Sequence, residues 1–385
     1  MARIFFSAHD PAGHTVMDSV DAGNAEQAIA SLAARGLANI RLRDVAELIA
    51  PRDERGGYPT AAPQALLPLR QQPEPSLRTF CAELLRRQRY WVALAAFLLA
   101  SGLVLAQAIV VLLALGVLAF ALLPALLQYR YAICHDRLLR AMAFGRWTDA
   151  AALAGQLASQ VRKPMPAFDL AARAACICAA QGELEKARTA LEPWRERLHA
   201  KSPTLVDQRL AMVNYAAGDY AAFVAASCAA HLAAPADLAL RVDLALAEAR
   251  VGDLLAALEL LAGVDPRKLP ASRRPFHDWA RGMIALRHGR SEAVTALAGA
   301  TRSLQAHAAN PATWLSLAQC SGAYALALAQ QGRRDEAEAV LRPVWPVLRV
   351  HGDRLLLTLL RRELPAFASQ ADKARRDDRV ARRGG

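Results

Sequence analysis

The sequence predicts a mainly α-helical protein: an α-solenoid of helix pairs, with a transmembrane helical hairpin and a small N-terminal β-β-α-β unit. Three observations predict this fold. Alanine, the residue with the highest helix propensity, recurs along nearly all of the 385 residues. Residues 91–127 form a run without any charged side chain. Glycine-containing turns then recur at a nearly constant spacing through the rest of the chain.

Residues 1–50 are predicted to form the small α/β unit. The segments 3–8 and 14–21 have the composition of strands, and a third strand is predicted over 39–43. Between the first two, Asp10-Pro-Ala-Gly13 is typical of a turn, because proline presets φ and glycine accepts a positive φ. A unit of this size buries little surface, so we expect it to be marginally stable alone.

One helix is predicted in this unit, over residues 25–35. Asn24 precedes it, and Gln27 follows three residues later, which is the spacing of a capping box. Gly36 is placed to end the helix, since a glycine at this position accepts a left-handed backbone.

Short motifs in this unit carry a resemblance to a known family. They are an aromatic strand with an Asp-x-x-Gly turn (Phe6 to Gly13), Asp21-Ala22, the helix start Glu26-Gln27-Ala28, Leu32, and the exit Gly36-Leu37. The unit resembles the N-terminal unit of the inner-membrane platform proteins of type II secretion and type IV pili. The resemblance covers about a tenth of the chain, and the helical bundles of that family are not found in the rest. It implies a shared docking module.

Residues 51–76 are a predicted linker. They contain six prolines and the pair Gly56-Gly57, which exclude regular structure and favour an extended chain. A basic juxtamembrane segment follows over 77–90.

Residues 91–128 are predicted to be a transmembrane helical hairpin that turns near Ser101–Gln107. One crossing needs about 20 residues, and this run is nearly twice as long. Basic residues lie on both sides of it, namely Arg86, Arg87, Arg89, Arg130, Arg137 and Arg140. The positive-inside bias then puts both ends in the cytoplasm, as two crossings require. A single tilted span and a buried helix pair of a soluble protein are the alternatives.

Residues 129–365 are predicted to be helical repeats. Their turns begin at Gly145, Gly182, Gly218, Gly252, Gly289 and Gly332, which are 37, 36, 34, 37 and 43 residues apart. Seven residues before these glycines, where closely packed helices need small side chains, stand Ala175, Ala211, Ala245, Gly282 and Ala325; Leu138 before the first turn is the exception. These repeats resemble the TPR family in degenerate form, since the large aromatic residues of the first helix are mostly missing. The resemblance implies a superhelix with a concave surface.

A partner-binding groove is predicted on that concave surface. Transferring the inner-face positions of the TPR family by their offset from each glycine selects Asp169 and the proposed partner-binding residues Leu205, Gln208, Met212, Tyr215, Val242, Leu246, Phe276, Trp279, Met283, Leu286 and Arg287. This apolar set suits an amphipathic helix or an extended peptide of a protein partner. The alternative is that the chain itself fills the groove, with its last helices or with the basic tail over 366–385.

Composition and motifs restrict the function classes. The net charge is +12, but arginines are not interleaved with aromatic residues, so we expect no nucleic-acid partner. We found no phosphate-binding loop, dinucleotide fingerprint or zinc-protease motif. The six cysteines show no framework or metal-ligand spacing. We therefore expect no enzyme activity, no catalytic residue, no cofactor, no metal and no small-molecule substrate.

Two functions fit these features. The first is a scaffold or adaptor that is anchored in a bacterial inner membrane and has its soluble parts in the cytoplasm. It would bind protein partners in a secretion or pilus assembly. The second is an accessory factor that organises biosynthetic enzymes. The hairpin followed by TPR-like helices is similar in layout to HemY-type proteins of haem biosynthesis, although the N-terminal unit and linker have no counterpart there.

Overall fold

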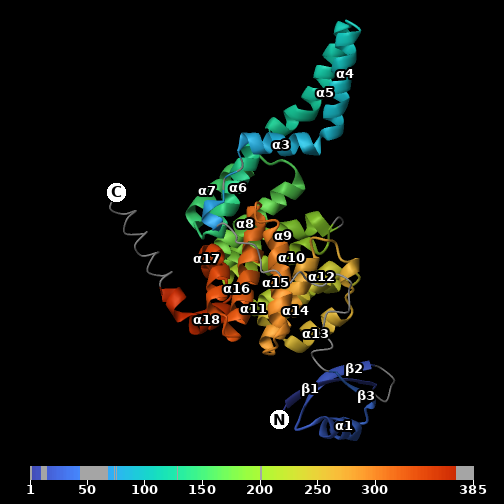
Figure 1. Cartoon of the computed structure of the whole chain (residues 1–385), viewed down its shortest axis with the longest axis vertical. Coiled ribbons are helices and arrows are strands. Elements are labelled where there is room, and N and C mark those ends of the chain that lie inside the picture. Colours follow the sequence, from blue (N-terminus) through green and yellow to red (C-terminus); the bar gives the residue numbers. More distant parts are fainter. Residues whose placement is uncertain are drawn as a thin grey trace. The chain divides into compact units, whose positions relative to one another are not determined.

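The computed structural model describes residues 2–9, 15–43, 68–72, 74, 76–127, 129–199 and 202–369. It is mainly helical (Figure 1). By their contacts the residues divide into two compact units, Arg70–Ala174 and Met1–Leu69 with Ala175–Gly385. The predicted turn at 10–13, residues 51–67 of the predicted linker and residues 370–385 of the predicted tail lie outside the described residues.

The N-terminal elements follow in the predicted β-β-α-β order. They are β1 (Ala2–His9), β2 (Thr15–Ala22), α1 (Ala25–Ala34) and β3 (Ala38–Arg43). The three strands form an antiparallel sheet in the order β2-β1-β3. Its small core is made by Val20, Ala22, Ala28 and Leu32, with Leu37, Ile40 and Leu42 packed against it.

The predicted capping of α1 is confirmed. The backbone N–H of Gln27 donates to Asn24 Oδ1 over 2.8 Å, and Gln27 Oε1 accepts from the N–H of Gly23 over 3.1 Å. At the other end, Gly36 has a φ of 78° and its N–H donates to the carbonyl of Ala33. These bonds satisfy backbone groups that a helix leaves unpaired at its ends.

The unit Arg70–Ala174 contains an apolar helical hairpin. Its helices are α3 (Leu77–Arg87), α4 (Arg89–Val104), α5 (Ala108–Leu127), α6 (Tyr129–Ala143) and α7 (Trp147–Ala158). Helices α4 and α5 lie side by side and antiparallel (Figure 1). Between them the chain turns through Ala106, whose φ is 51°, within the segment where the sequence predicts the turn.

The two arms pack closely through small residues, while their large side chains face outward. A Cβ on Gly102 would lie 2.9 Å from Val111 Cγ2, and Ala95 and Ala114 are buried. The exposed large side chains include those of Tyr90, Phe97, Leu103, Val104, Ile109, Leu112 and Phe120. Within the described part of the chain, no helix meets the combined length and apolarity required of a membrane-spanning helix.

The segment before α3 is not wholly irregular, in contrast to the predicted linker. A short 3-10 helix, η1 (Leu69–Gln71), interrupts it. Beyond η1, the carbonyl of Gln72 accepts from Arg140 Nη1 over 2.8 Å, and Glu74 pairs with Arg137 at 3.1 Å. These bonds to α6 order a stretch whose composition alone predicts no structure.

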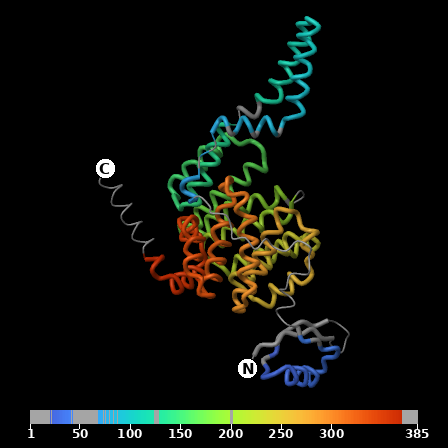
Figure 2. Tube along the Cα trace, viewed as in Figure 1, coloured from blue at the N-terminus to red at the C-terminus, as the bar shows by residue number. Residues whose placement is uncertain are grey.

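From α8 onward the chain is a series of helices. They are α8 (Pro164–Ala180), α9 (Leu184–His199), α10 (Leu205–Ala217), α11 (Tyr220–Ala233), α12 (Leu238–Val251), α13 (Leu254–Ala262), η2 (Pro266–Lys268), α14 (Arg274–Arg287), α15 (Glu292–Gln305), η3 (Pro311–Thr313), α16 (Trp314–Gln330), α17 (Arg334–His351) and α18 (Arg354–Glu363). Helices α10 and α11, α14 and α15, and α16 and α17 pack as neighbouring pairs (Figure 2).

The six predicted turns each lie between two helices, and a new helix begins two or three residues after each glycine. Five of the six glycines have a φ between 67° and 92°, a left-handed conformation that costs other residues energy. Gly252 differs, with a φ of −113°.

The small residues predicted before the turns are buried where helices meet. Ala175, Ala211, Ala245 and Ala325 are each at most 5% exposed. A Cβ on Gly282 would lie only 2.6 Å from Leu297 Cγ on the paired helix, so no larger residue fits there without movement. The spacing of small residues therefore marks the close helix contacts correctly.

Candidate partner-binding groove

The predicted groove residues lie on three helices of one compact unit. Leu205, Gln208, Met212 and Tyr215 are on α10, Val242 and Leu246 on α12, and Phe276, Trp279, Met283, Leu286 and Arg287 on α14. The structure joins part of this set through a residue that the repeat pattern does not select, Arg250. Its guanidinium carbon lies 4.6 Å from the centre of the Tyr215 ring and 5.2 Å from the Trp279 ring.

Burial divides the predicted residues into two groups. Val242, Leu246, Trp279, Met283 and Leu286 are at most 7% exposed. Met212 is 44% exposed and Arg287 is also exposed, whereas Leu205, Gln208, Tyr215 and Phe276 are half-buried. Most of the apolar side chains therefore already pack against the chain itself.

The end of α17 contacts this region through Tyr215. Tyr215 Oη donates to the carbonyl of His351 over 2.8 Å, although the two residues are 136 positions apart. Gln319 Nε2 donates both to Tyr215 Oη, over 2.8 Å, and to the same carbonyl, over 2.9 Å. Arg250 Nη2 also donates to Tyr215 Oη, over 2.5 Å. One hydroxyl thus connects α10, α12, α16 and the end of α17.

The start of α18 is held next to it by Asp353. This residue caps α18, because its Oδ1 accepts from the N–H of Leu356 over 2.7 Å, and its carboxylate pairs with Arg250 at 3.6 Å. Both side chains of the pair are at most 8% exposed. The N–H of Arg354 donates to Tyr220 Oη over 3.2 Å. In the described residues, the α17–α18 junction therefore bonds to α10, α11 and α12.

The repeat pattern in the sequence does not select Arg250, Gln319 or Asp353 as groove residues. Asp353 alone had a local signal, since an Asp directly before the leucine-rich segment 355–360 is a helix-start pattern. Arg250 and Gln319 lie inside helices and have no such signal, because their partners are distant in sequence.

A cavity of about 220 Å³ remains beside α18. Its lining contains three of the predicted residues, Met283, Leu286 and Arg287; the other lining residues are Arg250, Leu326, Gln330, Asp353, Leu355, Leu356 and Leu359. The walls are thus mainly apolar. An apolar cavity of about 150 Å³ accepts a benzene ring, so this one has room for a leucine or phenylalanine side chain of a partner.

Arg287, which lines this cavity, also forms hydrogen bonds at the end of α12. Its Nη1 donates to the carbonyls of Glu248, Ala249 and Gly252, at 3.1 to 3.3 Å, around the C-terminal end of α12; the Glu248 carbonyl also accepts from the N–H of Gly252. Partial burial lowers the pKa of Arg287 from its ordinary value. Its hydrogen bonds stabilise the end of α12.

Burial is the largest cause of the pKa shift of Tyr215, at the centre of the predicted groove. It raises the pKa of Tyr215 to about 12, although the neighbouring Arg250 acts in the opposite direction. The Tyr215 hydroxyl therefore stays protonated and can donate to His351 at every physiological pH. Nearby on α16, burial raises the pKa of the Cys320 thiol to about 12, which makes that thiol a poor nucleophile.

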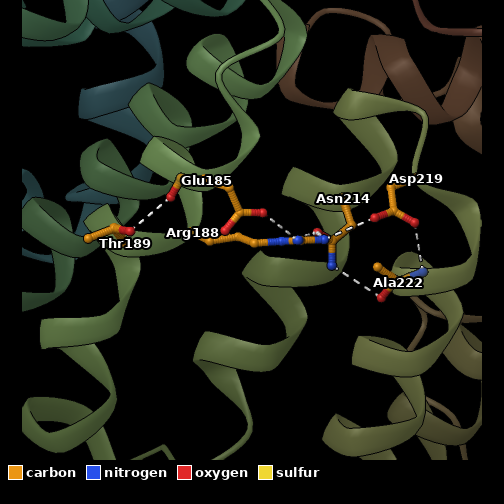
Figure 3. Close-up of polar contacts among 6 residues, drawn as sticks. All are labelled: Glu185, Arg188, Thr189, Asn214, Asp219 and Ala222. Carbon is orange, nitrogen blue, oxygen red and sulfur yellow. Dashed lines mark hydrogen bonds and ion pairs between the residues drawn. The ribbon is translucent and has the colours of Figure 1, made fainter.

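A second polar cluster joins α9, α10 and α11 (Figure 3). Arg188 donates to Asn214 Oδ1 from Nη2 over 2.9 Å, and pairs with Asp219 at 3.0 Å and Glu185 at 2.9 Å. Asn214 is buried, and its Nδ2 donates to the carbonyl of Ala222 over 3.1 Å. Asp219 meanwhile caps α11. All these side chains satisfy one another, so the cluster fixes successive helices rather than presenting free groups.

The chain has no match in three comparisons: no family profile, no curated protein and no solved structure is similar to it. Among the described residues, no group of three or more His, Cys, Asp or Glu side chains could hold a metal ion.

Proposed function

We propose that this chain is a membrane-anchored scaffold that binds protein partners at the cytoplasmic face of a bacterial inner membrane. In this proposal the α4–α5 hairpin inserts into the lipid bilayer as two crossings, and a TPR-like solenoid formed by the later helices holds the partner.

The observation that carries the proposal is the exposed apolar surface of the hairpin. Phe97 is 68% exposed, Val104 84% and Ile109 81%. Large apolar surfaces of this kind mark sites that contact a membrane or another protein. The hairpin has no charged side chain between 91 and 127, and Tyr90 and Trp91 stand at its base, where interfacial aromatic residues are enriched in membrane proteins. Lipid is therefore the favoured contact.

The partner is proposed to meet two places: the exposed Met212 on α10, and the cavity whose lining includes Met283 and Leu286 on α14 and Leu355 on α18. An amphipathic helix or a short extended segment could place one apolar side chain in the cavity. The resemblance of residues 1–50 to secretion and pilus platform proteins favours a component of such an assembly as the partner.

The anchor is tested by membrane fractionation of cells that express the full chain. The double variant Leu112→Arg/Phe120→Arg places two charges on the hairpin, each unfavourable by about 2.5–3.5 kcal/mol at the centre of a bilayer. We expect the wild type in the alkali-resistant membrane pellet and this variant largely in the supernatant. Leu355→Arg is the matched control, since Leu355 is also exposed but lies on α18. Equal pelleting of both variants would refute insertion of the hairpin.

Orientation is tested with reporter fusions at residues 80 and 385. Two crossings predict that a periplasm-active reporter is inactive at both positions. Activity at residue 385 alone would contradict the hairpin topology.

Partner binding is tested by photo-crosslinking from Met212 in cells, with identification of the product by mass spectrometry. A secretion or pilus component should be recovered, and its recovery should fall when the cavity is filled by Leu286→Trp. Recovery of biosynthetic enzymes instead would favour the HemY-like alternative.

A further inference from the structure

Helix α3 lies across the base of the α4–α5 hairpin, within the same compact unit (Figure 1). It is held there in part by the ring of Phe80, whose centre is 5.1 Å from that of Tyr129 on α6. Helix α3 thus lies crosswise to the hairpin (Figure 1). If the hairpin stands upright in a bilayer, α3 lies along the bilayer surface.

One side of α3 is apolar and remains partly exposed. Leu77 is 51% exposed and Leu85 is 44% exposed, while Phe80, Cys81 and Leu84 are half-buried. At 100° per residue, Leu77 and Leu85 are only about 80° apart on the helix. Such an apolar strip beside charged residues is typical of helices that lie in a membrane interface.

The sequence around this strip is rich in arginine. Between residues 77 and 130 the sequence has five arginines (Arg78, Arg86, Arg87, Arg89 and Arg130) and one acid, Glu83. Arg78 is exposed and is about 20° from Leu85 around the helix. Arg89 and Arg130 follow α3 and α5 closely, so the antiparallel hairpin brings both to its base, and both are exposed.

Arg89 also contacts the aromatic ring of Tyr90. Its Nη2 donates to Tyr90 Oη over 2.8 Å, and its guanidinium carbon is 4.8 Å from the centre of that ring. Tyr90 itself is 73% exposed. A tyrosine ring with a guanidinium beside it suits the boundary between acyl chains and phosphate groups.

We propose that α3 is an interfacial helix that binds anionic phospholipids, with Leu77 and Leu85 in the outer acyl region and Arg78, Arg89 and Arg130 on the phosphates. This proposal rests on the insertion of the hairpin proposed above, and it adds a preference for one class of lipid. Guanidinium groups recognise phosphates with paired hydrogen bonds, and basic residues near an anionic surface are attracted electrostatically.

The test measures hydrogen exchange of the full chain in nanodiscs. One set contains phosphatidylcholine only, and the other contains phosphatidylcholine mixed with phosphatidylglycerol. We expect the amides of α3 to exchange roughly tenfold more slowly in the anionic discs, because several arginines each favour the anionic surface. High salt should remove most of that difference. The double variant Arg78→Gln/Arg130→Gln should also reduce it, whereas the matched variant Arg361→Gln/Arg362→Gln, on α18, should not.

Exchange of the hairpin in the same samples separates the two proposals. Slow exchange of α4 and α5 in both lipids, together with equal exchange of α3, would overturn the lipid preference alone. Rapid exchange of α4 and α5 in both lipids would overturn the membrane anchor and the lipid preference together. Unchanged protection of α3 in Arg78→Gln/Arg130→Gln would also refute the role of the arginines.

Discussion

At the residue scale, Tyr215 connects several helices of the groove through one hydroxyl. Its hydroxyl accepts hydrogen bonds from Arg250 and Gln319 and donates one to the carbonyl of His351. A buried hydroxyl with several partners stabilises a fold mainly because its removal leaves those partners unsatisfied.

We predict that Tyr215→Phe lowers the free energy of unfolding by about 1–3 kcal/mol, since three hydrogen bonds lose one partner. Tyr220→Phe is the control, because the Tyr220 hydroxyl accepts a single bond of 3.2 Å from the N–H of Arg354. Urea denaturation followed by circular dichroism measures both. Equal losses in the two variants would contradict a central role for Tyr215.

The raised pKa of Tyr215 predicts a loss of stability at alkaline pH. The ordinary tyrosine pKa is near 10, and burial raises that of Tyr215 to about 12. Between these values the folded state keeps a proton that the unfolded state has released, so stability falls as pH rises from about 10 to 12. The contribution of one group is at most about 1.4 kcal/mol per pH unit. Denaturation at pH 9 to 11.5 should show a smaller decline for Tyr215→Phe than for the wild type.

At the scale of single elements, α18 is fixed by the residue directly before it. Asp353 both caps the helix and pairs with the buried Arg250. Helix α13 offers a comparison, because Asp253 caps it through the N–H of Leu255 but is exposed and has no ion pair within 4 Å among the described residues.

We predict that Asp353→Ala destabilises the fold by about 3–5 kcal/mol, because it removes a cap and leaves Arg250 buried without its partner. Asp253→Ala should have an effect of about 1 kcal/mol, the loss of a cap alone. Hydrogen exchange should locate the first effect at α18. The ion-pair argument would be wrong if Arg250→Met did not reduce the effect of Asp353→Ala in a double-mutant cycle.

The elements themselves follow from local sequence. The turns at Gly145 to Gly332, the cap at Asn24 and the hairpin turn near Ala106 were predictable, because each depends on residues within a few positions. Which residues of the groove are buried by distant parts of the chain was not predictable. The positions on α10, α12 and α14 predict an apolar surface, but the α17–α18 junction bonds to Tyr215 and Tyr220, more than 130 residues away, and no periodicity encodes such contacts.

At the scale of the unit that contains α10–α18, these long-range contacts change how the helices cooperate. In an array where each repeat contacts only its neighbours, segments can unfold separately. Here the α17–α18 junction also bonds to Tyr215 on α10 and Tyr220 on α11. The helices between α11 and α17 therefore belong to a series whose first and last helices are bonded to each other.

We predict that a chain ending at Gly352 unfolds less cooperatively. Loss of α18 uncovers part of the groove and removes the Asp353–Arg250 pair, while the contacts between neighbouring helix pairs stay. Urea denaturation should show a lower m-value or two resolved transitions. A single transition with an unchanged m-value would show that the contacts of Asp353 and α18 do not set the cooperativity.

The contacts of the α17–α18 junction with Tyr215 and Tyr220 can form only late in the synthesis of the protein. His351 leaves the ribosome 136 residues after Tyr215. At about 5–20 residues per second, the apolar side chains of α10, α12 and α14 therefore wait on the order of ten seconds before α18 can cover them. During that interval the nascent chain offers the surface that the finished protein hides, and a chaperone has its best opportunity to bind.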